Sequence, residues 1–167
     1  MTKVVIATRD WSRRPEFGGH MWVPMQYLLG LRDLGVEARW VDHLKRVKAY
    51  RKDHTPEYLR DRFRDACRDG GVEGAGRIVY AGGDAHVGCT PSDLARAAGE
   101  ADLLLTIGRV PPSDSPLLEI PRRAYVDVDP GFTQIWALQR DIGLGDYDHF
   151  FTVGQNVGSP EFGIPTA

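Results

Sequence analysis

The chain has 167 residues, of which 42% are hydrophobic and 26% are charged, and its formal net charge is −2 at pH 7. Those proportions are typical of a globular domain with its own core. The charge excludes a general attraction to nucleic acid, and no apolar run is long enough to span a membrane. Cys67 and Cys89 are too few for a disulfide framework, so we expect reduced thiols in a cytoplasmic protein.

The first part of the chain has the pattern of a strand, a glycine-containing loop, a helix and a second strand. The expected ranges are 4–8, 9–19, 20–34 and 36–41. Pro24 has no backbone N–H, which places it in the first turn of the helix and the helix start near His20 or Met21. Gly35 ends the helix. Together these segments predict one βαβ unit.

Strand and helix patterns continue to alternate along the rest of the chain. Further strands are expected at 77–81, 103–107, 124–128 and 150–153, and helices are expected after the capping residues Thr55, Thr90 and Asp129. Alternation of this kind predicts an α/β fold: a doubly wound, Rossmann-like, mainly parallel sheet of about six strands. We expect one domain over residues 1–158 and the start of an interdomain linker at 159–167.

The expected ligand site of such a sheet lies beyond the carboxyl ends of its strands. That rule selects the segments 9–20, 82–90, 108–115, 127–133 and 154–158. The first of them is longer than a usual strand-to-helix loop, which favours a binding role. Asp84, His86 and Cys89 share a glycine-rich loop, but three such residues without a fourth ligand do not make a metal site, and none is expected.

Several residues of this pattern resemble the start of GT-B glycosyltransferases. Gly18-Gly19-His20, with Pro24 four residues later and a leucine-rich helix that ends at Leu34-Gly35, carries the resemblance, which segments 120–136 and 150–156 extend. It implies that this chain is the acceptor-binding half, and that a C-terminal half holds most of the nucleotide-sugar. That half is absent from this chain, so a C-terminal domain or a partner subunit is implied. No cofactor is expected, and the nucleotide-sugar is a co-substrate.

The resemblance implies that His20 removes a proton from the acceptor hydroxyl in an inverting enzyme. Asp127, at the end of a predicted strand, is the candidate for the carboxylate that orients His20. The alternative for His20 is a helix-entry histidine that bonds backbone or only binds ligand. Asp127 and Asp129 also resemble the metal-binding Asp-x-Asp pair of GT-A enzymes, although helix capping alone explains Asp129 before Pro130.

Six further residues are candidates for substrate contact. Gly18 and Gly19 would let a donor phosphate approach the helix start, although glycine also serves ordinary turns. Trp11 is expected to be exposed and to pack on the acceptor, whereas Trp22 and Trp136 suit the core equally well. The remaining candidates, expected at strand ends, are Gln134, Gly154 and Asn156.

Two functions follow from these observations. The first is the acceptor-binding half of a nucleotide-sugar-dependent glycosyltransferase, inactive without its donor-binding half. The alternative is a stand-alone module that binds a small molecule or a partner without catalysis. A dinucleotide-dependent dehydrogenase fits poorly because no Gly-x-Gly-x-x-Gly follows the first strand. A flavodoxin-like carrier is compatible with the fold, which does not decide function.

Overall fold

A computed structural model describes residues 1–14, 18–44, 55–80, 89–161 and 163 of the chain. The strands are β1 (Lys3–Arg9), β2 (Glu37–Leu44), β3 (Gly76–Tyr80), β4 (Leu103–Ile107), β5 (Arg123–Asp127) and β6 (His149–Thr152). The helices are α1 (Gly18–Asp33), α2 (Pro56–Asp69), α3 (Pro91–Glu100), the 3-10 helix η1 (Pro116–Glu119) and α4 (Phe132–Gln139).

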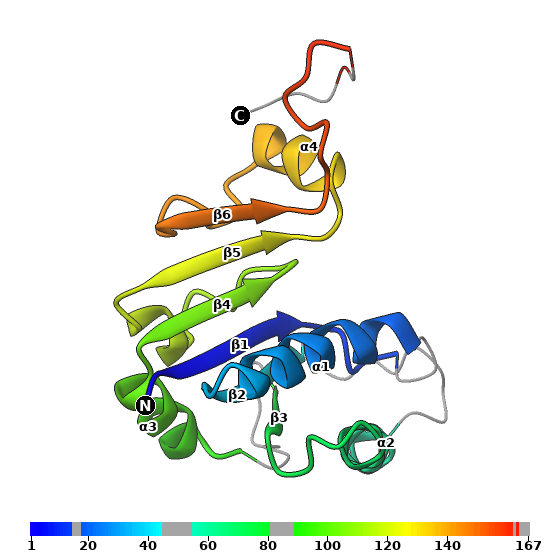
Figure 1. Ribbon diagram of the computed structural model, residues 1–167, viewed down its shortest axis with the longest axis vertical. Coiled ribbons are helices and arrows are strands. Elements are labelled where there is room, and N and C mark those ends of the chain that lie inside the picture. The colour runs from blue at the N-terminus through cyan, green and yellow to red at the C-terminus, as the bar shows by residue number, and fades with distance from the viewer. Residues whose placement is uncertain (15–17, 45–54, 81–88, 162, 164–167) are drawn as a thin grey trace.

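The six strands form a single all-parallel sheet in the order β3-β2-β1-β4-β5-β6 (Figure 1). All five neighbouring pairs are parallel. The chain builds outward from β1 to β3 in one direction and then from β4 to β6 in the other. The order therefore reverses between β1 and β4, as in a doubly wound Rossmann-like sheet, and the predicted fold class is confirmed.

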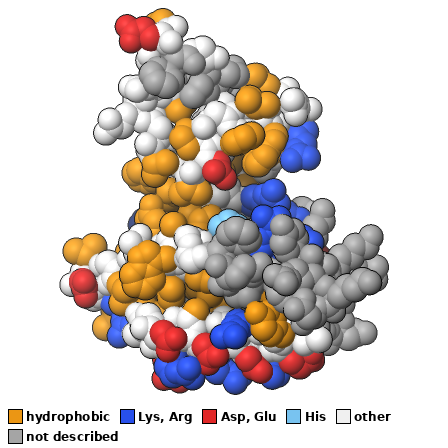
Figure 2. Space-filling model, turned by 90° about the vertical axis from the view of Figure 1, so that its right-hand side faces the viewer, with side chains coloured by type: hydrophobic (Ala, Val, Ile, Leu, Met, Phe, Trp, Pro, Cys, Tyr) orange, Lys and Arg blue, Asp and Glu red, His pale blue; other side chains and the backbone are white. Residues whose placement is uncertain are grey.

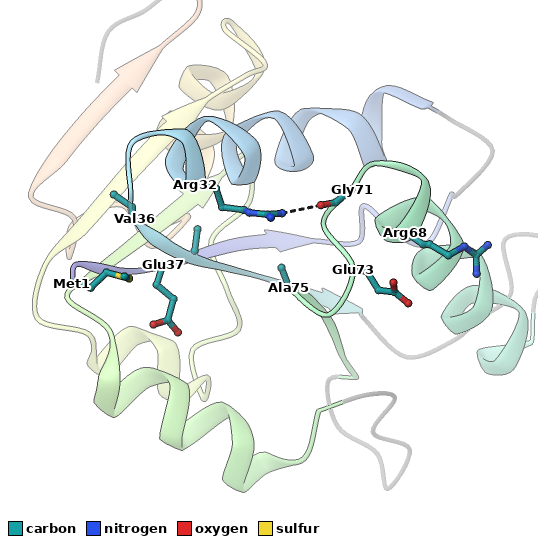
Figure 3. Close-up of a pocket in the computed structure, with 9 residues that line it drawn as sticks. Met1, Arg32, Val36, Glu37, Arg68, Gly71, Glu73 and Ala75 are labelled. Carbon is teal, nitrogen blue, oxygen red and sulfur yellow. Dashed lines mark hydrogen bonds between the residues drawn. The ribbon is translucent and has the colours of Figure 1, made fainter.

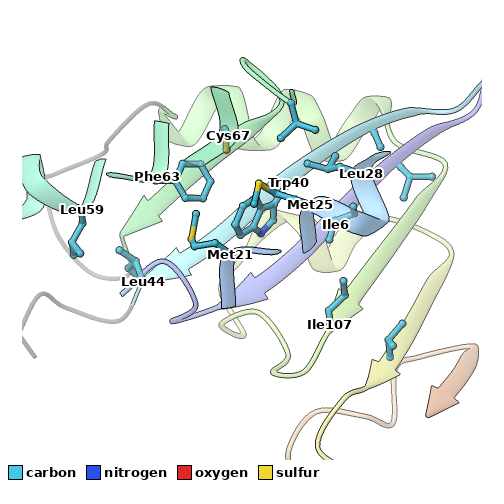
Figure 4. Packing of buried hydrophobic residues seen from close by; sticks show 14 residues of the cluster. Ile6, Met21, Met25, Leu28, Trp40, Leu44, Leu59, Phe63, Cys67 and Ile107 are labelled. Atoms are coloured by element: carbon cyan, nitrogen blue, oxygen red, sulfur yellow. The ribbon is translucent and has the colours of Figure 1, made fainter. Parts of the chain in front are cut away.

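Two hydrophobic clusters cover the two faces of this sheet. Side chains of α1 and α2 pack on one face around Trp40 (Figure 4). Trp40 is fully buried, and its ring contacts the tilted ring of Phe63 at 4.6 Å between centroids. Side chains of α3 and η1 pack on the other face against β1 and β4. Alternate residues of β1 enter alternate clusters, because successive side chains of a strand point to opposite faces. Ile6 belongs to the first cluster, and Val5 and Ala7 belong to the second.

Three helix ends follow the sequence prediction. The Thr55 hydroxyl accepts a 3.2 Å hydrogen bond from the N–H of Tyr58. Thr90 and Asp93 form the reciprocal bonds of a capping box. Gly35 has φ +74°, and its N–H donates to the carbonyl of Arg32. A left-handed residue at this position closes the helix, and glycine adopts it without strain.

The predicted start of the first helix was wrong. Helix α1 already includes Gly18 and Gly19, so Pro24 lies inside the helix and not in its first turn. Pro24 has no N–H to donate to the carbonyl four residues before it, which is that of His20. Its ring is buried with Met21, Met25 and Leu28 on the core side. Pro24 therefore lacks one helical hydrogen bond but buries its apolar ring in the core.

The predicted cap of the last helix was also wrong. Helix α4 begins at Phe132, and the residue before it is Gly131, with φ +97°. The N–H of Gly131 donates a 2.6 Å hydrogen bond to the side chain of Gln134. Asp129 contributes its backbone carbonyl, which accepts from the N–H groups of Phe132 and Thr133. The carboxylate that supports this turn is that of Asp127, two residues before the expected Asp129.

Candidate functional site

The carboxyl ends of β1 and β4 meet at the point where the strand order reverses, which is where ligands bind in sheets of this kind. Figure 2 views the molecule from the side toward which the strands run. At mid-height a histidine lies beside a group of Lys and Arg side chains, with hydrophobic side chains around them. The segments that follow β1 and β4 begin at this edge of the sheet.

A buried carboxylate fixes the segment after β1. Asp42, near the end of β2, is fully buried and accepts hydrogen bonds from the Thr8 hydroxyl and from both the N–H and the hydroxyl of Ser12. The N–H of Trp11 donates to the same carboxylate at 3.3 Å. Burial raises the pKa of Asp42 above its usual value, and these hydrogen bonds oppose that rise. The position of Trp11 is thus determined by β2.

Trp11 and His20, two of the candidate site residues, lie together. Their ring centroids are 5.7 Å apart, with 31° between the ring planes. The indole also approaches Gly108, where an added Cβ would lie 3.4 Å from the Trp11 ring. Trp11 is half-buried and not exposed as predicted, and Trp22 is the exposed tryptophan, at 48%. A half-buried Trp11 still presents a ring face beside the His20 imidazole.

Gly18 and Gly19 are exposed residues at the beginning of α1 as described. No atom lies within 4 Å of a Cβ built on either residue, and neither has a positive φ. The described fold therefore gives no steric or conformational reason for glycine here. Open space above both backbones is compatible with the close approach of a ligand, which is the role that the sequence suggested.

Asp127 is buried at the end of β5, and its carboxylate joins three segments. Oδ1 accepts from the Thr133 hydroxyl at 2.7 Å and from the N–H of Asp129 at 3.1 Å. Oδ2 accepts from the side chains of Gln134 at 3.0 Å and Thr152 at 3.2 Å. The predicted residues Asp127 and Gln134 are thus in direct contact. Their contact ties α4 and β6 to the end of β5.

The last two predicted residues follow β6. A Cβ added to Gly154 would lie 2.6 Å from Pro130 and 2.7 Å from Val157, so only glycine fits against this turn. The N–H of Gly154 donates to the Thr152 hydroxyl at 3.0 Å, which links it to the Asp127 group. Asn156 is exposed, and its carbonyl accepts from the N–H of Ser159. Close packing explains why residue 154 is a glycine, whereas Asn156 is exposed on the surface.

A buried histidine that the sequence did not single out lies at the same edge. His43 is 2% exposed, and its Nε2 is 3.0 Å from the hydroxyl oxygen of Ser115. Burial, followed by the nearby charge of Arg9, lowers the pKa of His43 from 6.5 to about 4. The ring is therefore neutral at pH 7. Because Ser115 also accepts from the N–H of Leu117, this pair joins β2 to η1.

A pocket lies at the amino-terminal edge of the sheet, away from these residues. It measures about 510 Å³ and includes Arg32, Arg68, Glu37 and Glu73 (Figure 3). Arg32 reaches across it and donates a 2.8 Å hydrogen bond to the carbonyl of Gly71. Its position opposite the carboxyl ends of the strands makes it a weaker candidate for a ligand site.

Sequence reasoning missed the residues that build the site from beneath. Thr8, Ser12, Asp42 and His43 are polar side chains buried near strand ends, and the predicted second strand stopped at residue 41. A polar pair such as Asp42-His43 directly after an apolar strand was the available signal. Residues 45–54 and 81–88, including Asp84 and His86, lie outside the described residues.

Neither a protein-family model nor a curated protein matches this chain. Within the described ranges, no three His, Cys, Asp or Glu side chains come close enough together to hold a metal ion. The same part of the chain contains no helix with the length and apolar character needed to cross a membrane.

Proposed function

We propose that this chain is the acceptor-binding half of a nucleotide-sugar-dependent glycosyltransferase. The observation that carries the proposal is the tilted ring contact of Trp11 and His20 beside the reversal of strand order. An imidazole is the side chain best suited to exchange a proton near neutral pH, and an indole face suits the flat apolar side of a small molecule. Open backbone at Gly18 and Gly19 adjoins the pair.

In the proposed reaction, the imidazole of His20 takes the proton of the acceptor hydroxyl while the hydroxyl oxygen attacks the anomeric carbon of the sugar. The bond from that carbon to the nucleoside diphosphate breaks, and the diphosphate leaves with the electron pair. Trp11 would position the acceptor against His20. Most contacts to the nucleotide-sugar would come from a C-terminal half or a partner subunit.

Exposed apolar side chains support the need for a second half. The surface of α4 and β6 exposes Phe132 at 61%, Phe151 at 58% and Val153 at 60%. Phe132 opens α4 and Val153 follows β6, so both lie at the carboxyl edge. Large apolar side chains grouped at one edge are typical of a surface that another domain covers.

The hydrogen bonds of Asp127 favour the alternative, a binding module without catalysis. Its carboxylate accepts from four groups of the segments that follow β5 and β6, so those bonds explain its burial without reference to His20. A histidine that binds ligand needs no orienting carboxylate, whereas a general base gains from one. The experiment below therefore separates binding from transfer.

The test compares the chain alone with the chain joined to a donor-binding half, using a panel of UDP- and dTDP-sugars and small hydroxylated acceptors. We expect acceptor binding by the chain alone and transfer only with both halves. His20→Ala should lower transfer by roughly 10²- to 10⁴-fold, whereas the matched variant His149→Ala, on the exposed edge strand β6, should keep it. Binding with no transfer in any combination would establish the binding module, and transfer by the chain alone would refute both readings.

A further inference from the structure

A cleft of about 840 Å³ lies on the side of Gly108 away from His20. Gly108 lines the cleft, whereas Trp11 packs against the hydrophobic cluster under α1 and α2, on the other face of the sheet. Arg9 follows Val5 and Ala7 in strand alternation, so it projects on the face of α3 and η1. Tyr125 pairs in register with Thr106, on that same face as Leu104. The cleft is thus separated from the Trp11–His20 pair by the sheet edge itself.

Three arginines line this cleft, and one of them, Arg109, forms an ion pair with Asp10. Arg109 is 3.7 Å from the carboxylate of Asp10, which is too long for a hydrogen bond. Among the described residues, neither Arg9 nor Arg140 has a carboxylate oxygen within 4 Å. This holds although Asp141 and two other aspartates line the same cleft. Arg9 donates one hydrogen bond, of 3.4 Å, to the carbonyl of Val110, and a guanidinium has further N–H donors for an anion.

The walls around these arginines are structured. The guanidinium of Arg109 lies over the ring of Trp136, 5.7 Å from its centroid, which holds an otherwise exposed side chain. The Tyr125 hydroxyl donates to the carbonyl of Gly108 and fixes the loop after β4. Asp10 has φ +64°, a left-handed conformation unusual for a residue other than glycine. Strained backbone of this kind is concentrated at functional positions.

We propose that this cleft binds a small polyanion that carries phosphate or carboxylate groups, through Arg9, Arg109 and Arg140. Planar guanidinium forks pair with both kinds of group in two parallel hydrogen bonds, so the shared chemistry is a multivalent oxyanion. The site lies on the opposite side of Gly108 from His20. It therefore does not depend on the proposed glycosyl transfer and stands if that transfer is refuted.

The test is calorimetric titration of the whole chain at low salt with inorganic pyrophosphate, and in parallel with citrate as the carboxylate probe. We expect saturable binding of at least one of them at millimolar concentration or below. Arg109→Gln and Arg140→Gln should each weaken it by roughly 10- to 100-fold, the effect of losing hydrogen bonds to a charged group. Both side chains are exposed, and thermal unfolding of each variant checks that the fold is intact.

Arg96→Gln is the matched control, because Arg96 is an exposed arginine of α3 outside the cleft lining. The Arg96→Gln variant should bind each probe as tightly as the unchanged chain does. Equal weakening by Arg96→Gln would show a general charge effect and overturn the site. Absence of saturable binding of either probe at millimolar concentration would also overturn it. Loss of binding in His20→Ala would refute a site separate from the Trp11–His20 pair.

Discussion

The hydroxyl of Thr8 stands between two buried side chains of β2. It accepts a 2.8 Å hydrogen bond from the indole N–H of Trp40 and donates one of 2.7 Å to the carboxylate of Asp42. Trp40 is the centre of the core cluster under α1 and α2, and Asp42 holds the segment that carries Trp11. One hydroxyl of β1 thereby links the core to the candidate site.

Removal of the Asp42 carboxylate should destabilise the fold and release Trp11. In Asp42→Ala the buried donors of Thr8 and Ser12 lose their acceptor, and we expect unfolding free energy to fall by about 3 kcal/mol. Urea denaturation measures this, and the exposed variant Asp33→Ala should show no change. Thr8→Val should also destabilise, because it removes the acceptor of Trp40. A fall of less than about 0.5 kcal/mol in Asp42→Ala, the usual scale of surface changes, would contradict the buried network.

The neutral, buried His43 should make stability depend on pH. Its folded pKa of about 4 lies below the unfolded value of 6.5, so between them the unfolded chain binds more protons than the folded one. The contribution of His43 to the unfolding free energy should therefore be fully present above pH 6.5. It should be lost as the pH drops toward 4, which lowers the unfolding free energy by up to roughly 3 kcal/mol.

Urea denaturation at pH 7.5 and pH 4.5 measures the effect of His43. The variant His43→Gln carries no titrating ring, so its stability should change less between the two pH values than that of the unchanged chain. His149→Gln, exposed on β6, should behave like the unchanged chain. An equal loss on acidification in all three proteins would show that His43 is not the source.

Two glycines should respond to alanine in opposite directions. A Cβ at Gly76 would lie 2.6 Å from Phe63 and 2.8 Å from the sulfur of Cys67, so Gly76→Ala should cost about 1–3 kcal/mol. Gly19 is helical and faces open space, so Gly19→Ala should stabilise the fold by about 0.5–1 kcal/mol.

Gly19→Ala also tests whether a ligand approaches that backbone. If the acceptor or donor contacts it, the variant should bind more weakly while its melting temperature rises. Both quantities are measured on one sample, by thermal unfolding and by titration with the acceptor that binds best. A variant that is more stable and binds equally well would remove Gly19 from the site.

Asp127 should behave mainly as a structural residue. Asp127→Ala leaves the side chains of Thr133, Gln134 and Thr152 without their acceptor, and we expect a loss of about 3 kcal/mol in unfolding free energy. Thr133→Val removes one of these bonds and should cost less. If Asp127 instead orients His20, Asp127→Asn should shift the pH profile of transfer in the assembled enzyme, whereas Thr133→Val should not.

The sequence by itself determined the layers of this protein. Apolar runs such as 103–107, alternating with capped helices at Thr55 and Thr90, were enough to predict a doubly wound parallel sheet, because burial on both faces requires continuous apolar strands. It also placed Trp11 and His20 at one edge, since the carboxyl ends of parallel strands meet there. Their roles in glycosyl transfer stay predictions.

Only the tertiary structure decided which polar residues meet. The contact of Thr8 with Asp42 depends on β1 pairing in register with β2, and that of Arg109 with Trp136 on the return of α4 toward β4. The contact of Thr152 with Asp127 likewise joins β6 to the end of β5, across 25 residues of the chain. Local patterns specify which face of an element is buried, but hydrogen-bond partners across a sheet depend on strand order and register, which local patterns do not encode.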